Sequence, residues 1–516
     1  MYQGRRGPFQ KAGESLRRLS LLIVATLIIL THGAEAAWRG HGQNSQHTAQ
    51  APVPAQTLNR IAWTTPIDLD PQVVGDELLI HYGAPIVTEA NTVILPVKTG
   101  ATDGFQIEAH NPVNGATLWT LVSDYQLPEH DWTPAYGPVL TMQSRVYYPG
   151  GAGLIRWRDN PNQKTGPTGW LAFYGAAAYQ ANQAAYQSSV QISTPLTADE
   201  SGNVYFGFVA SGAPGGLKSG IARVGADKTG ISISAAAASG DPSMTEVQTN
   251  CAPAISLDHS TLYIAVSNGP GGGYAGYLLG LDTTTLALKY KVRLKDPSVG
   301  DDAEINDDST ASPTIGPNGD VFFGVLARDY PYHHARGWLL HFDKTLKDTK
   351  IPGSFGWDNT PSVVPAKMVP SYTGKSSYLL MAKYNNYAGV GITLGNGHNE
   401  IAVLDPTASQ IDEYSSTNTS VMKEVMTLAG PTPFPGGVPG QTYEWCVNSA
   451  VVDPYTNSVF ANSEDGHLYR WNLKSNAVTE SIKLNGPLPQ AYTATIVGMD
   501  GTVYTTNNST FYAIRR

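Results

Sequence analysis

Polar and aromatic side chains recur in this chain just before short apolar segments that begin with Pro or a small residue. Carboxylates and imidazoles can move protons, a cysteine thiolate is a nucleophile, and a tryptophan ring can stack on a flat ligand. Gathered at one mouth, such groups would form a polar ligand site, although the same residue types also cap strands and turns. The candidate ligand-binding residues are His81, His130, Asp131, Trp132, Asn250, Cys251, Asp307, Asp308, Asp358, Asn359, Glu444, Trp445 and Cys446.

The densest acidic run, residues 301–308, could bind a cation. Carboxylate oxygens at this density suit Ca²⁺, although the run lacks the spacing of an EF-hand loop and could equally be a solvated loop. The adjacent His333 and His334 would point to opposite faces of a strand, so we predict exposed loop residues rather than a joint ligand pair. The candidate metal ligands are Asp301, Asp302, Glu304, Asp307 and Asp308.

The chain has two cysteines, Cys251 and Cys446, at equivalent positions of repeats three units apart. Neighbouring sheets pack about 10 Å apart, so on an eight-unit ring the two Cα atoms should lie roughly 17–24 Å apart. A disulfide needs Cα atoms within about 7 Å. We therefore predict two free thiols and no disulfide, unless the Pro- and Gly-rich loop 430–440 folds inward.

One unit recurs along the chain at a spacing of roughly 45 to 60 residues, as four-stranded propeller blades do. A short apolar strand is followed by an Asp/Asn/Gly turn, an aromatic-rich strand, a third strand and a fourth. Eight units can be counted, although seven remains open. The predicted third strands begin at Gly104, Gly169, Gly276, Gly337, Glu400 and Gly466.

The last unit ends at Arg516 after three strands, and Arg60–Trp63 offers a spare strand near the other end. Pairing the two would close the ring and cover both open edges. The sequence thus predicts an all-β, eight-bladed β-propeller of four-stranded antiparallel blades.

Residues 1–36 are typical of a signal peptide. Arg5, Arg6, Lys11, Arg17 and Arg18 precede an apolar run, and Ala34-Glu35-Ala36 supplies a small-x-small cleavage pattern before Ala37. The run is too short to cross a bilayer comfortably, although an uncleaved anchor is the alternative. We expect one propeller domain over 37–516, periplasmic or extracellular, monomeric and without a membrane span after cleavage. A net charge of −9 without a basic stripe argues against a nucleic-acid partner.

Two segments carry a family resemblance. Ala109–Trp119 resembles the A-x-D-x-x-T-G-x-x-x-W repeat of PQQ-like propellers, with Asn111 where Asp is usual, and Trp38–Thr48 resembles the segment that precedes their first blade. Later repeats keep Asp282, Asp343 and Asp405 but lose the Gly and Trp. The family includes quinoprotein alcohol dehydrogenases and non-catalytic scaffold propellers of the outer-membrane assembly type, so the resemblance implies the fold and not an activity.

A quinoprotein dehydrogenase of this family typically holds its cofactor between a Trp and a vicinal Cys-Cys disulfide, beside Ca²⁺ and an Asp base. This chain has no adjacent cysteines and no Cys-x-x-Cys-His haem site. We therefore favour a non-catalytic scaffold that binds a protein partner or small ligand through the channel-mouth face.

An atypical PQQ- and Ca²⁺-dependent oxidoreductase is the alternative. Its Ca²⁺ would come from residues 301–308, its stacking ring from Trp132 or Trp445, and its base from Asp131, Asp307 or Asp308. A glycan-active propeller is a third reading, for which the sequence offers no carboxylate spacing to test.

Overall fold

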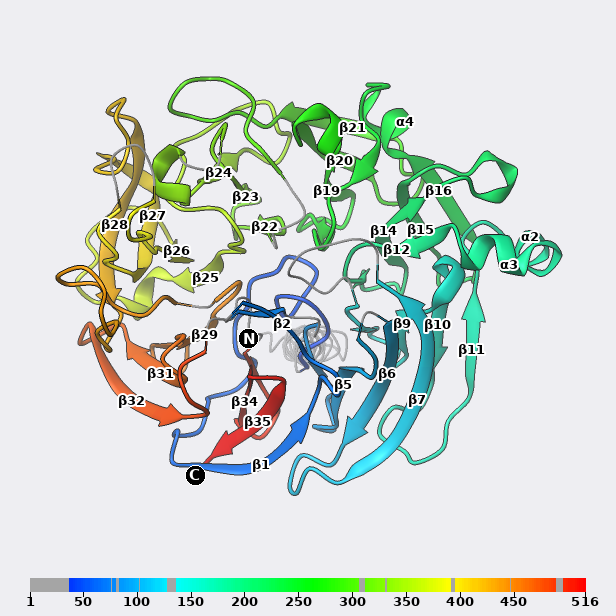
Figure 1. Cartoon of the computed structure of the whole chain (residues 1–516), viewed down its shortest axis with the longest axis horizontal. Coiled ribbons are helices and arrows are strands. Elements are labelled where there is room, and N and C mark those ends of the chain that lie inside the picture. Colours follow the sequence, from blue (N-terminus) through cyan, green and yellow to red (C-terminus); the bar gives the residue numbers. More distant parts are fainter. Residues whose placement is uncertain are drawn as a thin grey trace, which may run out of the picture. The chain divides into compact units, whose positions relative to one another are not determined.

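Each repeat of the sequence folds into one small antiparallel sheet. The computed structural model describes residues 37–75, 77–79, 83–101, 103–127, 136–305, 311–329, 332–390, 395–445, 447–488 and 495–516. In these residues eight sheets follow one another around a ring in chain order (Figure 1). The predicted eight-bladed β-propeller is confirmed.

The first four blades contain complete sheets, and in blades 3 and 4 the innermost strand is broken into two pieces that pair with the same neighbour. Blade 1 comprises β4 (Ile86–Val87), β5 (Val93–Lys98), β6 (Asp103–His110) and β7 (Thr117–Gln126). Blade 2 comprises β8 (Val139–Leu140), β9 (Val146–Pro149), β10 (Ile155–Arg158) and β11 (Thr168–Leu171). Blade 3 comprises β12 (Val190–Ile192), β13 (Thr197–Ala198), β14 (Val204–Ala210), β15 (Gly220–Val224) and β16 (Gly230–Ser234). Blade 4 comprises β17 (Glu246–Val247), β18 (Ala254–Ile255), β19 (Thr261–Ser267), β20 (Gly276–Asp282) and β21 (Leu288–Arg293).

The last four blades complete the ring. Blade 5 comprises β22 (Thr314–Ile315), β23 (Val321–Val325) and β24 (Trp338–Phe342). Blade 6 comprises β25 (Ser362–Pro365), β26 (Tyr378–Lys383), β27 (Glu400–Ile411) and β28 (Ser420–Ala429). Blade 7 comprises β29 (Val451–Asp453), β30 (Ser458–Asn462), β31 (His467–Asn472) and β32 (Ala477–Lys483). Blade 8 comprises β33 (Ile496–Val497), β34 (Val503–Asn507), β35 (Thr510–Arg515) and, from the start of the fold, β1 (Arg60–Pro66).

Two blades depart from the predicted pattern. The segment from Gly169 was predicted as a third strand, but it belongs to β11, the outermost strand, because β10 takes the third place. In blade 5, isolated bridges join Phe342 to Thr349 and Leu339 to Gly353, in place of a regular fourth strand among the described residues. Pro352 lies between them and has no N–H to donate to a ladder.

Burial explains the strand sequences. All residues of β5 are buried, because an inner strand has a neighbouring blade on both faces, whereas β32 alternates between exposed and partly buried residues. Apolar runs therefore mark inner strands and alternating runs mark outer ones.

The ring closes between its two ends. Antiparallel pairing runs from Arg60 opposite Arg515 to Pro66 opposite Thr510. The Trp63 ring lies 5.9 Å from Phe511, and its Nε1 donates a 2.9 Å hydrogen bond to the Pro112 carbonyl. The predicted closure is confirmed, since one sheet contains both β1 and β35.

Residues 37–56, here called the lead-in, lie across one end of the central channel and bond to the innermost strands (Figure 1). The contacts fall on the last residues of β4, β8, β18 and β22, the end opposite the loops that enter these strands. The lead-in therefore forms the floor of the channel, and the entering loops form its mouth. Hydrogen bonds to seven blades run from Trp38 N to Val87 O, Leu140 N to Arg39 O, Ile255 N to Ser45 O, Ile315 N to Gln46 O, Val363 N to Thr48 O, Ala51 N to Val452 O and Gln56 N to Gly501 O.

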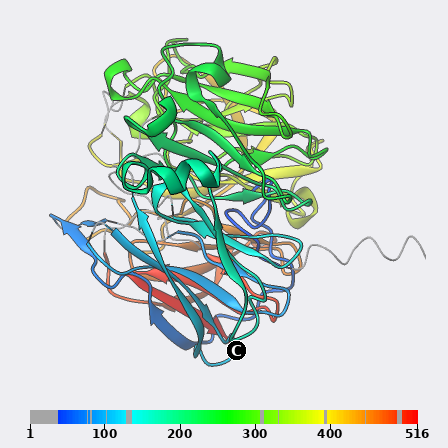
Figure 2. The same ribbon diagram turned by 90° about the vertical axis from the view of Figure 1, so that its right-hand side faces the viewer.

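Helices are few and short. The helices α2 (Ala176–Ala181) and α3 (Gln183–Gln187) lie on the outer rim of the ring and face the viewer in the side view (Figure 2). No helix in the described part of the chain is long and apolar enough to cross a membrane. The remaining elements are α4 (Ala235–Ser239), the hairpin β2 (Gln72–Val74) and β3 (Glu77–Leu79), and the 3-10 turns η1 (Gly151–Gly153), η2 (Pro214–Gly216), η3 (Pro270–Gly272), η4 (Tyr332–Ala335) and η5 (Ala366–Met368).

Candidate functional site

Hydrogen bonds between neighbouring loops form the rim of the channel mouth. They connect blades 2 to 7 in an unbroken series, and both backbone and hydroxyl groups take part. The rim is therefore a built structure rather than a set of independent turns. The bonds run from Leu196 N to Gly137 O (3.2 Å), Asn250 N to Ser193 O (2.8 Å), Ala252 N to Ser312 Oγ (2.9 Å), Ser312 N to Thr360 Oγ1 (3.0 Å) and Thr360 N to Asn448 O (2.9 Å).

Six of the candidate mouth residues fall within the described part of the chain: Asn250, Cys251, Asp358, Asn359, Glu444 and Trp445. All six lie on or beside this rim. The other candidates, which lie outside the described residues, are His81, His130, Asp131, Trp132, Asp307, Asp308 and Cys446.

Asp358 and Asn359 lie together with a cation that the sequence reasoning missed. The Asp358 carboxylate forms a buried ion pair with Lys383 Nζ, and the Lys383 backbone N donates to Asn359 Oδ1 at 3.1 Å. Asp358 adopts a positive φ of 53°, a strained conformation that persists only where the surroundings hold it. The available signal for Lys383 was a cation at the end of an apolar strand segment in a chain with few charges.

A neighbouring contact joins blades 6 and 7. The Asn385 side chain receives a hydrogen bond from Trp445 N at 3.2 Å and donates one to Trp445 O at 3.4 Å. The Trp445 ring is fully buried, 5.6 Å from Tyr469, and forms part of the blade core. It presents no exposed face for stacking, so that predicted role passes to Trp132, outside the described residues. The Glu444 carbonyl accepts from Glu464 N at 3.0 Å and supports the same loop.

The Arg336 guanidinium, also missed from sequence, holds this corner of the rim. It is fully buried and donates to the carbonyls of Ser354 (3.0 Å) and Asn385 (2.5 Å). Its Cζ atom lies 3.9 Å from the centroid of the Tyr414 ring. It thereby holds in place the loop whose Asn385 side chain bonds to the Trp445 backbone.

Cys251 is a free and fully buried thiol in the break between β17 and β18. Burial raises its pKa to about 12. A protonated thiol is a poor nucleophile, so Cys251 fills space at the rim rather than reacting. Cys446 lies outside the described residues, so the predicted distance between the two cysteines stays a prediction.

Asp301 and Asp302, two of the three carboxylates that the structure describes in the acidic run, pair with cations on the flank of blades 4 and 5. Asp302 pairs with Arg293 at 2.7 Å and Lys295 at 2.6 Å, and Asp301 pairs with Arg328 at 2.9 Å. Despite partial burial, the Arg293 hydrogen bond lowers the pKa of Asp302 to about 2. No group of three or more metal-ligating side chains lies together among the described residues. The calcium prediction, which also includes Asp307 and Asp308, stays a prediction.

The paired histidines of η4 are buried, contrary to the prediction of exposed loop residues. Both have positive φ angles, so the turn winds left-handed and sends each ring inward. The His333 ring stacks on Trp338 with centroids 3.7 Å apart, and its Nε2 lies 2.9 Å from Asp412 Oδ2. His334 Nδ1 lies 2.7 Å from Asn386 Oδ1.

Ser354, His333 and Asp412 do not form a hydrolase triad. The Ser354 hydroxyl donates to Asp412 Oδ1 at 2.6 Å, and the nearer His333 nitrogen is 3.4 Å away and already contacts the same carboxylate. The serine proton therefore goes to the carboxylate, so the histidine is not placed to activate it as a base.

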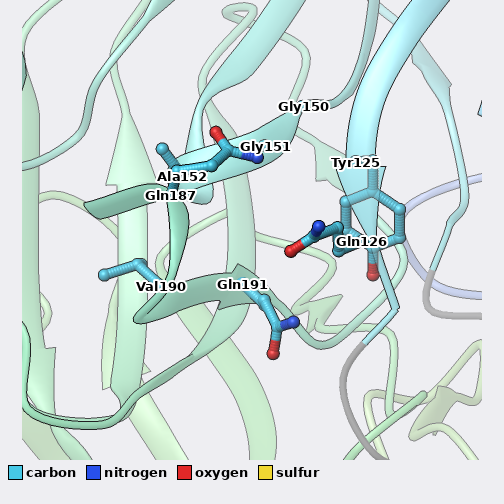
Figure 3. A pocket seen from close by; sticks show the side chains of 8 residues that line it. All are labelled: Tyr125, Gln126, Gly150, Gly151, Ala152, Gln187, Val190 and Gln191. Carbon is cyan, nitrogen blue, oxygen red and sulfur yellow. The ribbon is translucent and has the colours of Figure 1, made fainter. Parts of the chain in front are cut away.

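A narrow crevice lies between the end of β7, η1 and β12 (Figure 3). Gln126, Gln187 and Gln191 lie around it, and the Tyr125 hydroxyl donates to the Ile192 carbonyl at 2.6 Å. Burial raises the pKa of Tyr125. The crevice offers neither a charged group nor room for a water molecule, so it is not a candidate site.

Solved structures share this arrangement of blades. A europium-containing methanol dehydrogenase aligns with a TM-score of 0.56 at 10% identity, over 92% of this chain and 90% of its own. The fold is that of the PQQ-like propellers. The quinohemoprotein alcohol dehydrogenase from Comamonas testosteroni also aligns at 0.56, with 12% identity over 95% of this chain and 82% of its own.

BamB from Moraxella catarrhalis aligns at 0.37, with 10% identity over 89% of this chain and 99% of its own, too weakly to support an inference. No family model matches the sequence, and no curated protein matches it. At these identities the likeness shows a shared fold and leaves the activity open.

The described residues do not supply the cofactor site of a quinoprotein dehydrogenase. Adjacent cysteines are missing from the sequence, Trp445 is enclosed in the core, and the carboxylates of Asp301 and Asp302 are paired with cations. A stacked quinone beside Ca²⁺ has no fitting donor set in this part of the chain.

Proposed function

We propose that this chain is an exported propeller that binds a protein partner or small ligand through its channel-mouth face without catalysing a reaction. Cleavage of residues 1–36 would leave the propeller outside the cytoplasm, as a monomer. The Asp358–Lys383 pair and the hydrogen-bonded rim support this proposal, because they make the mouth rigid and polar. A pre-organised polar surface loses little freedom when it binds.

The proposal depends most on one observation: three described mouth residues already have structural roles. Asp358 neutralises a buried lysine, Trp445 fills the core and Cys251 is sealed from solvent. Each serves the rim, so none of these three is placed to attack a substrate. An oxidoreductase would have to draw its reacting groups from Asp131, Trp132, Asp307 and Asp308.

The first test separates binding from quinone chemistry. The mature chain from Ala37 is melted with and without PQQ and Ca²⁺, and dye-linked alcohol oxidation is followed in parallel. We expect no shift and no turnover. A raised melting temperature together with turnover that a chelator abolishes would establish the oxidoreductase instead.

A second test locates the binding face. Glu444→Lys changes the charge at the mouth, and Glu200→Lys makes the same change at an exposed turn after β13, at the opposite end of the blades. Partners captured from an extracytoplasmic extract should be lost with Glu444→Lys and kept with Glu200→Lys. Equal capture by both variants would remove the mouth from the proposal.

A further inference from the structure

Two histidines of the lead-in lie together on the channel floor. The rings of His41 and His47 are 5.0 Å apart between centroids, with their planes at 86°. The turn between them is held by hydrogen bonds from Gln43 N to Gly40 O and from Ala49 N to Gly42 O. The pair is thus built by a structured segment and does not depend on two mobile side chains.

Both rings carry a buried nitrogen without a partner. His47 is 1% exposed, and although His41 as a residue is only partly buried, its Nε2 atom is enclosed. Neither Nε2 atom has a hydrogen-bond partner among the residues that the structure describes. Buried polar atoms are almost always bonded, so two orphan nitrogens on touching rings require an explanation.

The tautomer of His47 is fixed by its other nitrogen. Nδ1 lies 2.7 Å from the Pro313 carbonyl, which can only accept, so Nδ1 carries the hydrogen. Nε2 is left with its lone pair free. A ligating histidine is commonly oriented in this way, by an Nδ1–H donated to a backbone carbonyl.

The spacing of the rings suits a shared metal ion. With metal–nitrogen distances of 2.0–2.1 Å and a tetrahedral angle, two imidazole centroids lie about 5.2 Å apart. The observed centroid separation is 5.0 Å. Imidazole nitrogens favour Zn²⁺, Cu²⁺ and Ni²⁺ over Ca²⁺ or Mg²⁺, which prefer oxygen ligands.

We propose that His41 and His47 bind a transition-metal ion, of the Zn²⁺ or Cu²⁺ type, through their Nε2 atoms at the channel floor. His47 reaches Pro313, which precedes β22, so its ring rises from the floor toward the mouth. Two protein ligands leave the remaining coordination positions of a four-coordinate ion to water or another ligand. This site does not depend on what binds at the mouth.

The test uses the full mature chain, stripped with a chelator and titrated with Zn²⁺ by calorimetry. We expect one ion per chain, and at least 10-fold weaker binding in both His41→Gln and His47→Gln. His259→Gln, which removes a partly exposed histidine from the turn after β18, should bind Zn²⁺ like the unaltered chain. No stoichiometric binding, or equal affinity in all variants, would overturn the proposal.

A spectroscopic readout also tests the site in the unaltered chain, where the folding of a variant plays no part. With one Cu²⁺ bound to the unaltered chain, electron paramagnetic resonance should show coupling to two imidazole nitrogens. His41→Gln, at the more exposed of the two positions, should show one. A spectrum without nitrogen coupling in the unaltered chain would place the ion elsewhere and contradict the proposal.

Discussion

The two ends of the channel are built in different ways. At the floor, one continuous segment reaches each of seven blades through at least one backbone–backbone hydrogen bond, and side chains such as Gln46 and Gln50 add further bonds. At the mouth, separate loops from successive blades are joined by particular side chains such as Ser312, Thr360, Asp358 and Lys383. Backbone bonding tolerates changes of side chain, whereas a rim made by side chains changes with each substitution. We therefore expect side-chain substitutions to disturb the rim more than they disturb the backbone bonds of the floor.

The largest effect is expected from Trp38, an apolar anchor of the floor. Its side chain is 2% exposed and packs in one core with Val87 and Val451. Trp38→Ala should lower the free energy of unfolding by about 3–5 kcal/mol, the cost of emptying a large buried site. Unfolding in urea measures this loss of free energy. A loss below about 1 kcal/mol would show that the floor is not anchored to the core.

At the mouth, the largest loss of folding stability is expected when the buried ion pair between Asp358 and Lys383 is broken. Asp358→Asn removes the negative charge that Asp358 places beside the buried Lys383 ammonium and should cost about 3 kcal/mol. The control Asp301→Asn removes an exposed partner of Arg328 and should cost less than about 1 kcal/mol. Equal costs, measured by denaturant melts, would mean that the Asp358 pair is solvated.

Two serines provide a direct contrast between backbone and side-chain bonding. Ser312 Oγ accepts the Ala252 N–H, so Ser312→Ala leaves a buried donor unsatisfied and should cost about 1–3 kcal/mol. At the floor, the bond to Ile255 uses the Ser45 carbonyl, so Ser45→Ala should cost less than about 0.5 kcal/mol. The reverse order of stabilities would refute the comparison.

Acid should lower the folding stability of the chain through the two histidines of the floor. Burial lowers the pKa of His41 to about 4 and that of His47 to about 3, below the unfolded value of 6.5. The unfolded chain therefore binds these protons first as the pH falls below 6.5, so the free energy of unfolding decreases between pH 6.5 and about 4.

This contribution is measured by comparing chelator-treated His47→Gln with the unaltered chain in urea at pH 7, 6 and 5. The variant should lose stability less steeply with acid. Parallel curves would show that His47 is accessible to protons in the folded state.

The smallest expected effect is a slow rate of alkylation at Cys251, at the mouth. With its pKa raised to about 12, only about one thiol in 10⁴ is ionised at pH 8, so alkylation should be slow in the folded chain and fast in urea. Peptide mapping after iodoacetamide treatment reads this residue separately from Cys446, and Cys251→Ala identifies its peptide. Rapid labelling of the folded protein would mean that the rim opens.

Local sequence pattern was enough to predict the blades. Segments such as Val93–Lys98 are apolar because a neighbouring blade covers both faces, and their turns and spacing lie within one repeat. Gly169–Leu171 was placed one strand too far inward because it begins with Gly, like most of the predicted third strands, whereas the true third strand β10 does not. The mouth was predicted as a set of loops, but its partner Lys383 is the last residue of β26 and Arg336 directly follows η4.

The sequence by itself predicted eight blades, closure of the ring by the strand Arg60–Trp63 and polar residue types at the mouth, because these depend on periodicity and on residue types at repeated positions. The tertiary structure alone decided that Trp445 is enclosed, that Lys383 neutralises Asp358 and that the lead-in crosses the channel with a pair of histidines. Such contacts join residues far apart in the chain, as His47 and Pro313 are, and no local pattern encodes which distant groups the closed ring brings together.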